Sequence, residues 1–394
     1  MRIDSAAARR AVWGLSAYST LRQVADVCQM LAINWYLAAS TGSAGMLGLA
    51  WVVSRLPWTV LPLAGFLADR VPRRRVILLG DLAVAVLGVV AVLVRPGRTA
   101  VLIVLAVYAL GYAAVRPATK GLPRELAGTS VDAARVSGLM TSLEYAAIFA
   151  AQLAVARWLL PRGPAWGLGA MVVTLALGAV ILRRTVPAGP PPAAPTRFGM
   201  RAVAAMLWSP ELRGPLALTV TCGGCAFVLL PLAPLLARGG PAHYGILMAG
   251  YSLGAAAGSA LARRTDGWRS GTRGAALAWV VAAPALAAAP RVHSVVAILA
   301  CYVVVGAAAG FADAGNAARV AAHVPLSAQS QAMALGSLVW RLPGVLAGGI
   351  VAVAAPLQPA SLCPVLAGVL AAVAVGGVLV PAGAPRVPAG PPVG

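Results

Sequence analysis

Charge is scarce in this sequence, and negative charge is especially scarce. Only 10% of the 394 residues are charged, against about 25% in an ordinary soluble domain, and only 10 are Asp or Glu. Hydrophobic residues make up 60% of the chain, and its mean hydropathy is +0.85. A bilayer span needs roughly 20 apolar residues, so this composition excludes a string of soluble domains and predicts a polytopic membrane protein.

The residues that catalysis and nucleotide binding need are also missing. The three histidines, His243, His293 and His323, have no acidic neighbour in the sequence. No segment has the form G-x-x-x-x-G-K-[ST], which cradles nucleotide phosphates. We therefore expect neither ATP-driven transport nor enzyme activity, and an enzyme embedded in the membrane is the least favoured alternative.

Cysteine offers no complete metal site. All five cysteines fall in apolar segments, and Cys222 and Cys225 have metal-ligand spacing without a second pair or a nearby His. We predict small thiols that pack between helices, with no metal and no cofactor.

Basic residues outnumber acidic residues by 31 to 10, which gives a net charge of +21. Gathered on one surface, this excess would suggest nucleic acid as a partner. The arginines instead form short clusters in alternate loops, such as Arg73 to Arg75 and Arg183 to Arg184. Loops on the cytoplasmic side of a membrane have this pattern, so we predict a multi-pass protein with both termini in the cytoplasm and no nucleic-acid partner.

Apolar segments recur along the whole chain, and their length and their Gly and Ala content favour helices. Twelve spans are predicted, over residues 12–39, 44–68, 76–94, 100–116, 134–159, 164–182, 212–236, 242–262, 274–290, 293–317, 328–353 and 360–380. Small residues at helical spacing should allow close helix contacts, as at Gly250, Gly254 and Gly258, and at Gly306 and Gly310.

A Pro-rich stretch over residues 186–195 cannot span the membrane and divides the spans into six and six. We predict a first six-helix half over residues 1–185, a cytoplasmic linker over 186–211, a second half over 212–381 and a disordered cytoplasmic tail over 382–394. Leu-Ala-Asp-Arg at 67–70, which ends span two, is echoed by Leu-Ala-Arg-Arg at 261–264, which ends span eight. This echo favours a duplicated unit.

The segment from Gly65 to Arg75, Gly-Phe-Leu-Ala-Asp-Arg-Val-Pro-Arg-Arg-Arg, joins spans two and three. It resembles the loop signature of the major facilitator superfamily, G-x-L-A-D-R-x-G-R-R, with Pro72 in the usual Gly position. The resemblance implies an all-α integral membrane fold with 12 transmembrane helices in two six-helix, pseudo-symmetric halves. It also implies a secondary transporter that moves a small-molecule substrate by alternating access, usually as a monomer in the lipid bilayer.

Shorter motifs resemble the bacterial branch that contains macrolide-efflux and enterobactin-export permeases. They are Thr41-Gly42-Ser43, Arg55-Leu56-Pro57, Leu79-Gly80-Asp81-Leu82 and Arg116-Pro117-Ala118. This branch implies a bacterial inner-membrane exporter of a lipophilic drug or natural product, driven by proton antiport and able to confer antibiotic resistance. Span five lacks the G-P-x-x-G-G motif of many antiporters, and span four lacks the mid-membrane Arg that is often tied to proton coupling. The direction of transport therefore stays open. The alternative is a proton-coupled importer of a small nutrient or siderophore-like compound.

The loop signature also implies a conformational gate. Asp69 ends a span at the cytoplasmic surface, where its carboxylate could face the positive amino end of a helix capped by Ser327. This contact would hold the cytoplasmic side shut, and its loss would favour inward opening. The other gate candidates are Gly65, Arg70, Arg73 and Arg74, and the arginines could also hold anionic lipid headgroups.

Ionisable residues inside the predicted spans need an explanation, because each costs roughly 2.5–3.5 kcal/mol near the bilayer centre. Asp26 has Arg22 four residues before it and Gln29 three after it, which places all three on one helical face. Arg22 and Asp26 could form a structural salt bridge, or Asp26 could bind the transported proton. The other proton-coupling candidates are Glu144 in span five and Asp313 in span ten.

Arg55 and Arg341 join Arg22 as predicted buried charge partners, and Glu144 could pair with Arg341 across the two halves. In the superfamily, spans 1, 4, 7 and 10 line the central cavity. The substrate-cavity candidates are Gln29, Trp35, Tyr108, Tyr112 and Asn316. Acids in a cavity suit cationic compounds, whereas its arginines could equally bind an anion, so the substrate stays open.

Overall fold

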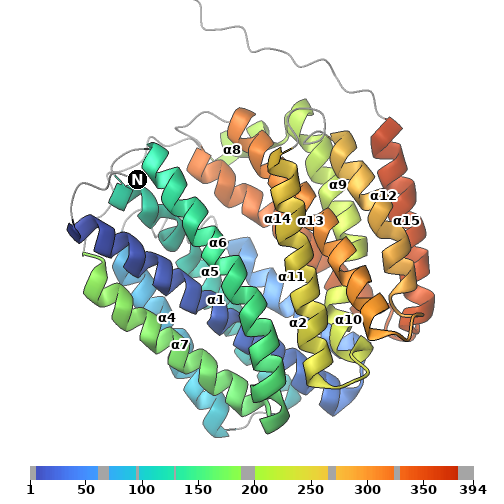
Figure 1. Ribbon diagram of the computed structural model, residues 1–394, viewed down its shortest axis with the longest axis horizontal. Helices are drawn as coiled ribbons and strands as arrows, with labels where there is room; N and C mark the ends of the chain where they lie inside the picture. The colour runs from blue at the N-terminus through green and yellow to red at the C-terminus, as the bar shows by residue number, and fades with distance from the viewer. Residues whose placement is uncertain are drawn as a thin grey trace, which may run out of the picture.

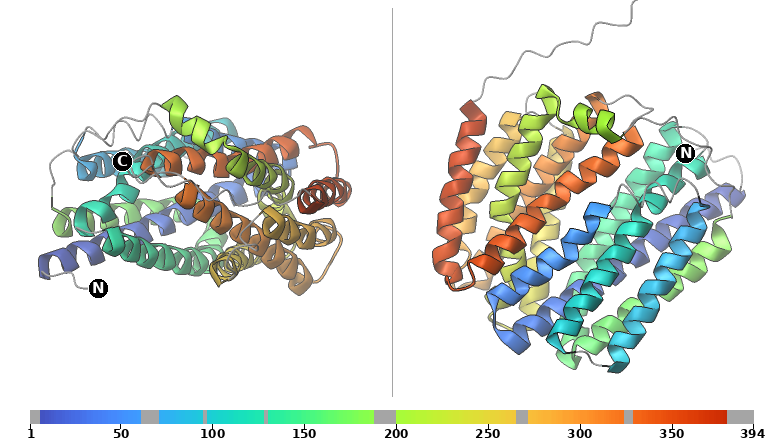
Figure 2. Two further views of the ribbon diagram at one scale, coloured as in Figure 1. Left: turned by 90° about the horizontal axis from the view of Figure 1, so that it is seen from above. Right: turned by 180° about the vertical axis from the view of Figure 1, so that it is seen from behind.

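The computed structural model describes residues 6–60, 71–94, 97–127, 130–187, 200–264, 272–323 and 329–379, and within these ranges it contains no β-strand (Figure 1). Its helices form two groups that lie side by side, one from each half of the chain (Figure 2). The arrangement confirms the predicted all-α membrane fold of 12 transmembrane helices in two six-helix halves.

The first half contains six spans. They are α1 (Ala6–Thr41), α2 (Ala44–Arg55) with the 3-10 turn η1 (Leu56–Val60), α4 (Arg73–Val94), α5 (Arg98–Ala127), α6 (Ser130–Ala154) with the turns η2 (Val155–Leu159) and η3 (Leu160–Arg162), and α7 (Pro164–Thr185). The helix α5 continues past the predicted end of its span at residue 116. A helix satisfies its own backbone groups in water as well as in lipid, so the end of an apolar run need not end the helix.

The second half begins with a short helix that was not predicted, α8 (Met200–Leu207), which packs against α14. Its six spans are α9 (Pro210–Ala226) with α10 (Leu229–Leu236), α11 (Pro241–Arg264), α12 (Thr272–Ala288), α13 (Val295–His323), α14 (Gln329–Val353) and α15 (Pro359–Leu379). The seventh span is broken between α9 and α10. Pro231 has no N–H for the Phe227 carbonyl, which instead accepts a hydrogen bond from the Leu230 N–H at 3.0 Å.

Apolar side chains cover the outside of the bundle. Eight described helical segments are long and apolar enough to cross a bilayer. The segments of α4 and α7 are only 28% buried over their most apolar window, whereas the segment of α9 and α10 is 78% buried. Leu93 and Val296 are 76% and 74% exposed, as expected for side chains that face lipid. The seventh span therefore lies inside the bundle, and α4 and α7 lie at its edge.

Three tight turns lie at the same end of the bundle. Gly42, Gly163 and Gly240 have positive φ values of 59°, 108° and 84°, which other residues rarely adopt. They lie between α1 and α2, between η3 and α7, and between α10 and α11. We call this end the hairpin end. The opposite end, where α1 begins, α7 ends and α8 lies, is the linker end (Figure 1).

The two halves approach each other closely at the hairpin end. Gly48 of α2 lies against the backbone of Gly348 and Ala352 of α14. Gly245 of α11 lies in the same way against the Gln152 carbonyl of α6. A Cβ atom on either glycine would overlap these backbone atoms, so the close approach requires glycine. Toward the linker end, the ribbons of the two halves diverge (Figure 2).

Within the second half, α11 and α13 pack along the predicted small residues. Gly254 and Gly258 of α11 lie against the backbone of α13, and Gly306 and Gly310 of α13 lie against the backbone of α11. The prediction of close helix contact at these glycines is confirmed. We call this contact the glycine seam.

Parts of the predicted organisation fall outside the described residues. These parts are residues 188–199 of the predicted linker, residues 65–70 of the loop signature and the whole predicted tail over 382–394. The helix α7 ends at Thr185 and α9 begins at Pro210, on either side of that linker.

Candidate functional site

One face of α1 carries polar side chains through the interior of the first half. Ser19, Arg22, Asp26 and Gln29 follow one another at spacings of three or four residues, which places them on one side of the helix. Arg22 and Gln29 are 6% and 3% exposed, so this face is buried against the other helices of the half.

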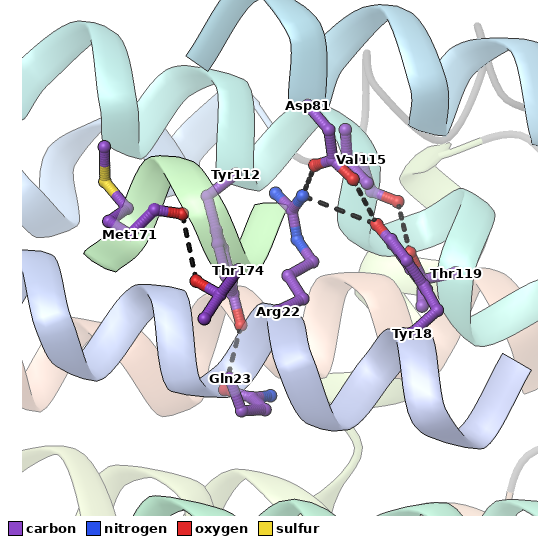
Figure 3. Close-up of polar contacts among 9 residues, drawn as sticks. All are labelled: Tyr18, Arg22, Gln23, Asp81, Tyr112, Val115, Thr119, Met171 and Thr174. Carbon is purple, nitrogen blue, oxygen red and sulfur yellow. Dashed lines mark hydrogen bonds and ion pairs between the residues drawn. The ribbon is translucent and has the colours of Figure 1, made fainter. Parts of the chain in front are cut away.

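Arg22 forms an ion pair with Asp81 of α4, and both side chains are buried (Figure 3). The Tyr18 hydroxyl donates a hydrogen bond to the second Asp81 oxygen at 2.8 Å, and Arg22 lies 3.4 Å from that hydroxyl. Of the two alternatives predicted for Asp26, the salt bridge with Arg22 is therefore wrong, because the partner of Arg22 is Asp81. The i,i+4 spacing places both side chains on one face of α1, but the packing of α4 against α1 brings a second carboxylate into contact with Arg22.

A pocket of about 450 Å³, counted with the open space at its mouth, lies beside Asp26. Its wall comes from α1, α2, η1 and α5, and contains Asp26, Gln29, Met30, Asn34, Trp51, Ser54, Arg55, Trp58, Leu105, Tyr108, Ala109 and Tyr112. We call it the Asp26 pocket. Asp26 makes no hydrogen bond or ion pair with any residue that the structure describes. Two buried donors at the wall, the Gln29 amide and the Trp51 indole N–H, also lack a partner among those residues.

A second pocket of about 250 Å³ contains Glu144 of α6. Glu144 is 6% exposed, and it accepts hydrogen bonds from the Ser19 hydroxyl and, at 3.4 Å, from the Gln23 amide. Gln23 in turn accepts a hydrogen bond from the Tyr112 hydroxyl at 3.3 Å. Tyr112 lines both pockets, so a chain of hydrogen bonds connects Glu144 to the wall of the Asp26 pocket.

Three arginines lie over tryptophan rings at the inner side of the first half. The guanidinium carbon of Arg55 lies 4.6 Å from the centre of the Trp51 ring. Those of Arg341 and Arg116 lie 4.0 Å and 5.4 Å from the centre of the Trp58 ring. Arg341 comes from α14 in the second half, so Trp58 contacts cations from both halves. Arg341 was predicted to pair with Glu144, and its contact in the structure is instead with Trp58.

Three other predicted site residues do not line either pocket. Trp35 stacks on Tyr244 of α11, with ring centres 6.2 Å apart. Asn316 is buried in the second half, where its amide donates to the Thr219 hydroxyl at 2.7 Å. Asp313 is exposed on α13. The predicted cavity residues that the structure brings together are Gln29, Tyr108 and Tyr112.

The gate candidates Gly65, Asp69 and Arg70 lie outside the described residues, and the gate stays a prediction. Arg74 donates hydrogen bonds to the carbonyls of Val186 and Arg183, at 2.8 Å and 3.0 Å. These carbonyls belong to the end of α7, where a cation stabilises the negative end of the helix. Arg74 thus joins α4 to α7 within the first half.

All five cysteines are buried free thiols, as predicted for packing residues. Within the described part of the chain, no group of three or more His, Cys, Asp or Glu residues could hold a metal ion.

Several residues of the two pockets were missed by the sequence analysis. Ser19, three residues before Arg22, continues the polar pattern of α1, so helical spacing alone could have indicated it, whereas Asn34 is five residues after Gln29 and does not follow that spacing. Trp51 and Trp58 carry no such signal, because a tryptophan in an apolar span is equally typical of lipid contact.

Comparison with known proteins agrees with this architecture. The family profile described as Major Facilitator Superfamily matches residues 16–348. No curated protein sequence matches the chain. The crystal structure of the nucleoside transporter NupG superimposes with a TM-score of 0.73 at 14% identity, covering 93% of this chain and 98% of that one.

Two further solved structures are similar. A mutant of the peptide transporter POT has a TM-score of 0.73 at 13% identity and covers 93% of each chain. A bacterial homologue of the human lysosomal transporter Spinster, in an inward-facing and unoccupied conformation, has a TM-score of 0.68 at 16% identity and covers 95% of each chain. At these identities the likeness shows the fold alone.

Proposed function

Because the chain belongs to the Major Facilitator Superfamily and is a membrane transporter, we propose that it exports a lipophilic drug or natural product by proton antiport. The observation that carries this proposal is Asp26. Its carboxylate lies at the wall of a pocket in the middle of the first half, without an ion pair to a described residue. Ionisable groups at such depth are costly, and they mark ion and proton pathways in transporters.

We propose that the linker end faces the cytoplasm of a bacterial cell. Arg9, Arg10, Arg183 and Arg184 lie at this end, in agreement with the positive-inside rule. In that orientation the contacts at Gly48 and Gly245 close the outer side, and the halves diverge toward the cytoplasm. The described conformation would then be the one that loads substrate from inside the cell.

Antiport requires that proton and substrate exclude each other. An ionised Asp26 attracts the cationic group of a substrate, whereas a protonated Asp26 does not. The aromatic wall at Tyr108, Tyr112 and Trp58 suits an apolar body and adds cation–π attraction. Proton binding on the outer side would release the substrate and favour the return of the protonated carrier, which releases its proton on the inner side, because each ligand shifts the equilibrium by its differential affinity.

We propose Glu144 as a second proton-coupling residue. An ionised Glu144 accepts from Ser19 and Gln23 of α1, and protonation would weaken both bonds between α6 and α1. Because Gln23 also contacts Tyr112, the change would reach the Asp26 pocket. Asp313, exposed on α13, is the proposed third group, on the opposite half.

The test uses everted membrane vesicles from an exporter-deficient bacterial host that expresses the full chain. A panel of fluorescent lipophilic cations is added outside, and the vesicle interior is made acidic. We expect proton-dependent accumulation that a protonophore abolishes and that Asp26→Asn abolishes. The matched control Glu211→Gln, in the first turn of α9, should accumulate like the wild type.

Two results would contradict the proposal. Release of dye from preloaded vesicles under the same gradient would show proton symport, and would favour the importer. Full dye accumulation in vesicles with Asp26→Asn would show that Asp26 does not couple transport to protons. Glu144→Gln, measured in parallel, would then show whether Glu144 is the proton-coupling residue.

A further inference from the structure

The three arginines over tryptophan rings are half-buried, and no contact with a carboxylate neutralises them as it does the buried Arg22. Arg22 is neutralised by Asp81 in direct contact. Arg55, Arg116 and Arg341 make no ion pair with a carboxylate among the residues that the structure describes. Asp26 acts electrostatically on Arg55 and Arg341, and Asp313 acts on Arg341, but neither carboxylate forms an ion pair with them.

Ring contacts replace only part of the water that these charges have lost. A cation–π contact contributes about 0.5–2 kcal/mol, and each half-buried guanidinium has given up part of its hydration. The three arginines also repel one another, since Arg116 and Arg55 both act on Arg341. An anion bound among them would remove both penalties.

The geometry suits one acidic group on an aromatic compound. Arg116 and Arg341 lie 5.4 Å and 4.0 Å from the centre of the same ring, so both guanidinium groups border the Trp58 side chain. A guanidinium binds carboxylates and phosphates through two parallel hydrogen bonds. Trp58 and Tyr112, whose ring centres are 5.3 Å apart, provide an aromatic surface next to these donors.

We propose that Arg116 and Arg341 form an anion-binding subsite beside the Asp26 pocket. The transported compound is then amphoteric: an acidic group binds the two arginines, and a cationic group faces Asp26. Arg341 belongs to the second half and Arg116 to the first, so the acidic group joins the halves when it binds. This inference rests on the proposed transport function, since it names the class of substrate.

The test measures binding of 2-naphthoate and of its neutral analogue 2-naphthamide to the purified full chain in lipid nanodiscs, by titration calorimetry. We expect naphthoate to bind on the order of tenfold more tightly, the usual effect of one charge-assisted hydrogen bond. Arg341→Gln should abolish the preference. Arg341→Lys, which keeps the charge, should restore part of it. The matched control Arg157→Gln, on the exposed surface of η2, should leave it unchanged.

Equal affinities of the wild type for the two probes would overturn the proposal, and this comparison needs no variant. An unchanged preference in both Arg116→Gln and Arg341→Gln would overturn it as well. Asp26→Asn distinguishes the two proposals, because it should lose proton-driven accumulation and keep the preference for naphthoate. If the wild type transports with the proton gradient but does not prefer naphthoate, the anion subsite is contradicted and the proposed function stands. If the wild type prefers naphthoate but shows no proton-driven transport, the proposed function is contradicted.

Discussion

The two halves share one architecture and carry different chemistry in their interiors. The first half buries charge, since Arg22, Asp81 and Glu144 are 6%, 1% and 6% exposed. In the described part of the second half, the buried polar side chains are uncharged: Thr219, Ser252 and Asn316. Its interior instead contains the glycine seam and the thiols of four cysteines.

The difference separates two tasks of a transporter. Charges in a low-dielectric interior respond strongly to a bound proton or ion, so the first half is suited to sense them. Backbones in direct contact cannot slide without opening voids, so the glycine seam keeps α11 and α13 together as a rigid unit.

The largest effect on stability should come from removing one partner of the Arg22–Asp81 ion pair in the first half. Asp81→Ala leaves Arg22 buried without its counter-ion, which typically lowers the free energy of unfolding by about 3–5 kcal/mol. Unfolding of the purified chain in mixed micelles, followed by circular dichroism, measures the loss. The double variant Arg22→Met with Asp81→Leu should recover most of it, and a double variant as unstable as Asp81→Ala would refute the electrostatic explanation.

The next largest effect on stability is expected from added side-chain volume at the glycine seam of the second half. Gly310→Ala places a Cβ against the α11 backbone at Ala255, and such overpacking costs about 1–3 kcal/mol. The same micelle unfolding measures it. Gly368→Ala on α15 is the matched control, because its Cβ would meet open space and helix propensity favours Ala. Equal effects of the two substitutions would show that the glycine seam is not tightly packed.

A single hydrogen bond of the second half should have a smaller effect. The buried Tyr302 hydroxyl donates to the Leu229 carbonyl at 2.6 Å, next to the break between α9 and α10. Tyr302→Phe should lower the free energy of unfolding by about 1 kcal/mol. Tyr145→Phe, at a side chain that is 39% exposed, should leave it unchanged. An unchanged free energy of unfolding in Tyr302→Phe would mean that another donor reaches the Leu229 carbonyl.

The smallest effect on stability is expected at Asp26, the proposed proton-coupling residue. Asp26→Asn removes a charge that forms no ion pair or hydrogen bond with a described residue, so the free energy of unfolding should change by less than about 1 kcal/mol, the net contribution of one ordinary hydrogen bond. Unfolding and vesicle transport should be measured on the same preparation. A destabilisation as large as that of Asp81→Ala would show that Asp26 is a structural charge, and the contrast between the two acids would disappear.

The positions of the spans could be predicted because apolar length is a local property. The break in the seventh span was missed, although Pro231 and Pro234 are visible in the sequence, because prolines are common in transmembrane helices and do not always break them. Helical spacing correctly placed Arg22, Asp26 and Gln29 on one face. It could not show that the partner of Arg22 is 59 residues away, at Asp81, since that depends on how α4 packs against α1.

The sequence by itself determined that this chain crosses the membrane many times as helices in two halves, and which polar residues lie inside the spans. Both follow from the transfer of side chains and backbone between water and lipid, which depends on each segment alone. Only the tertiary structure decided which charges neutralise each other and which stay available. The ion pair between Arg22 and Asp81, and the lack of such a pair between Asp26 and any described residue, result from the packing of several helices against one another. Electrostatic interaction in a low dielectric depends steeply on those distances, so the candidate site exists only in the folded bundle.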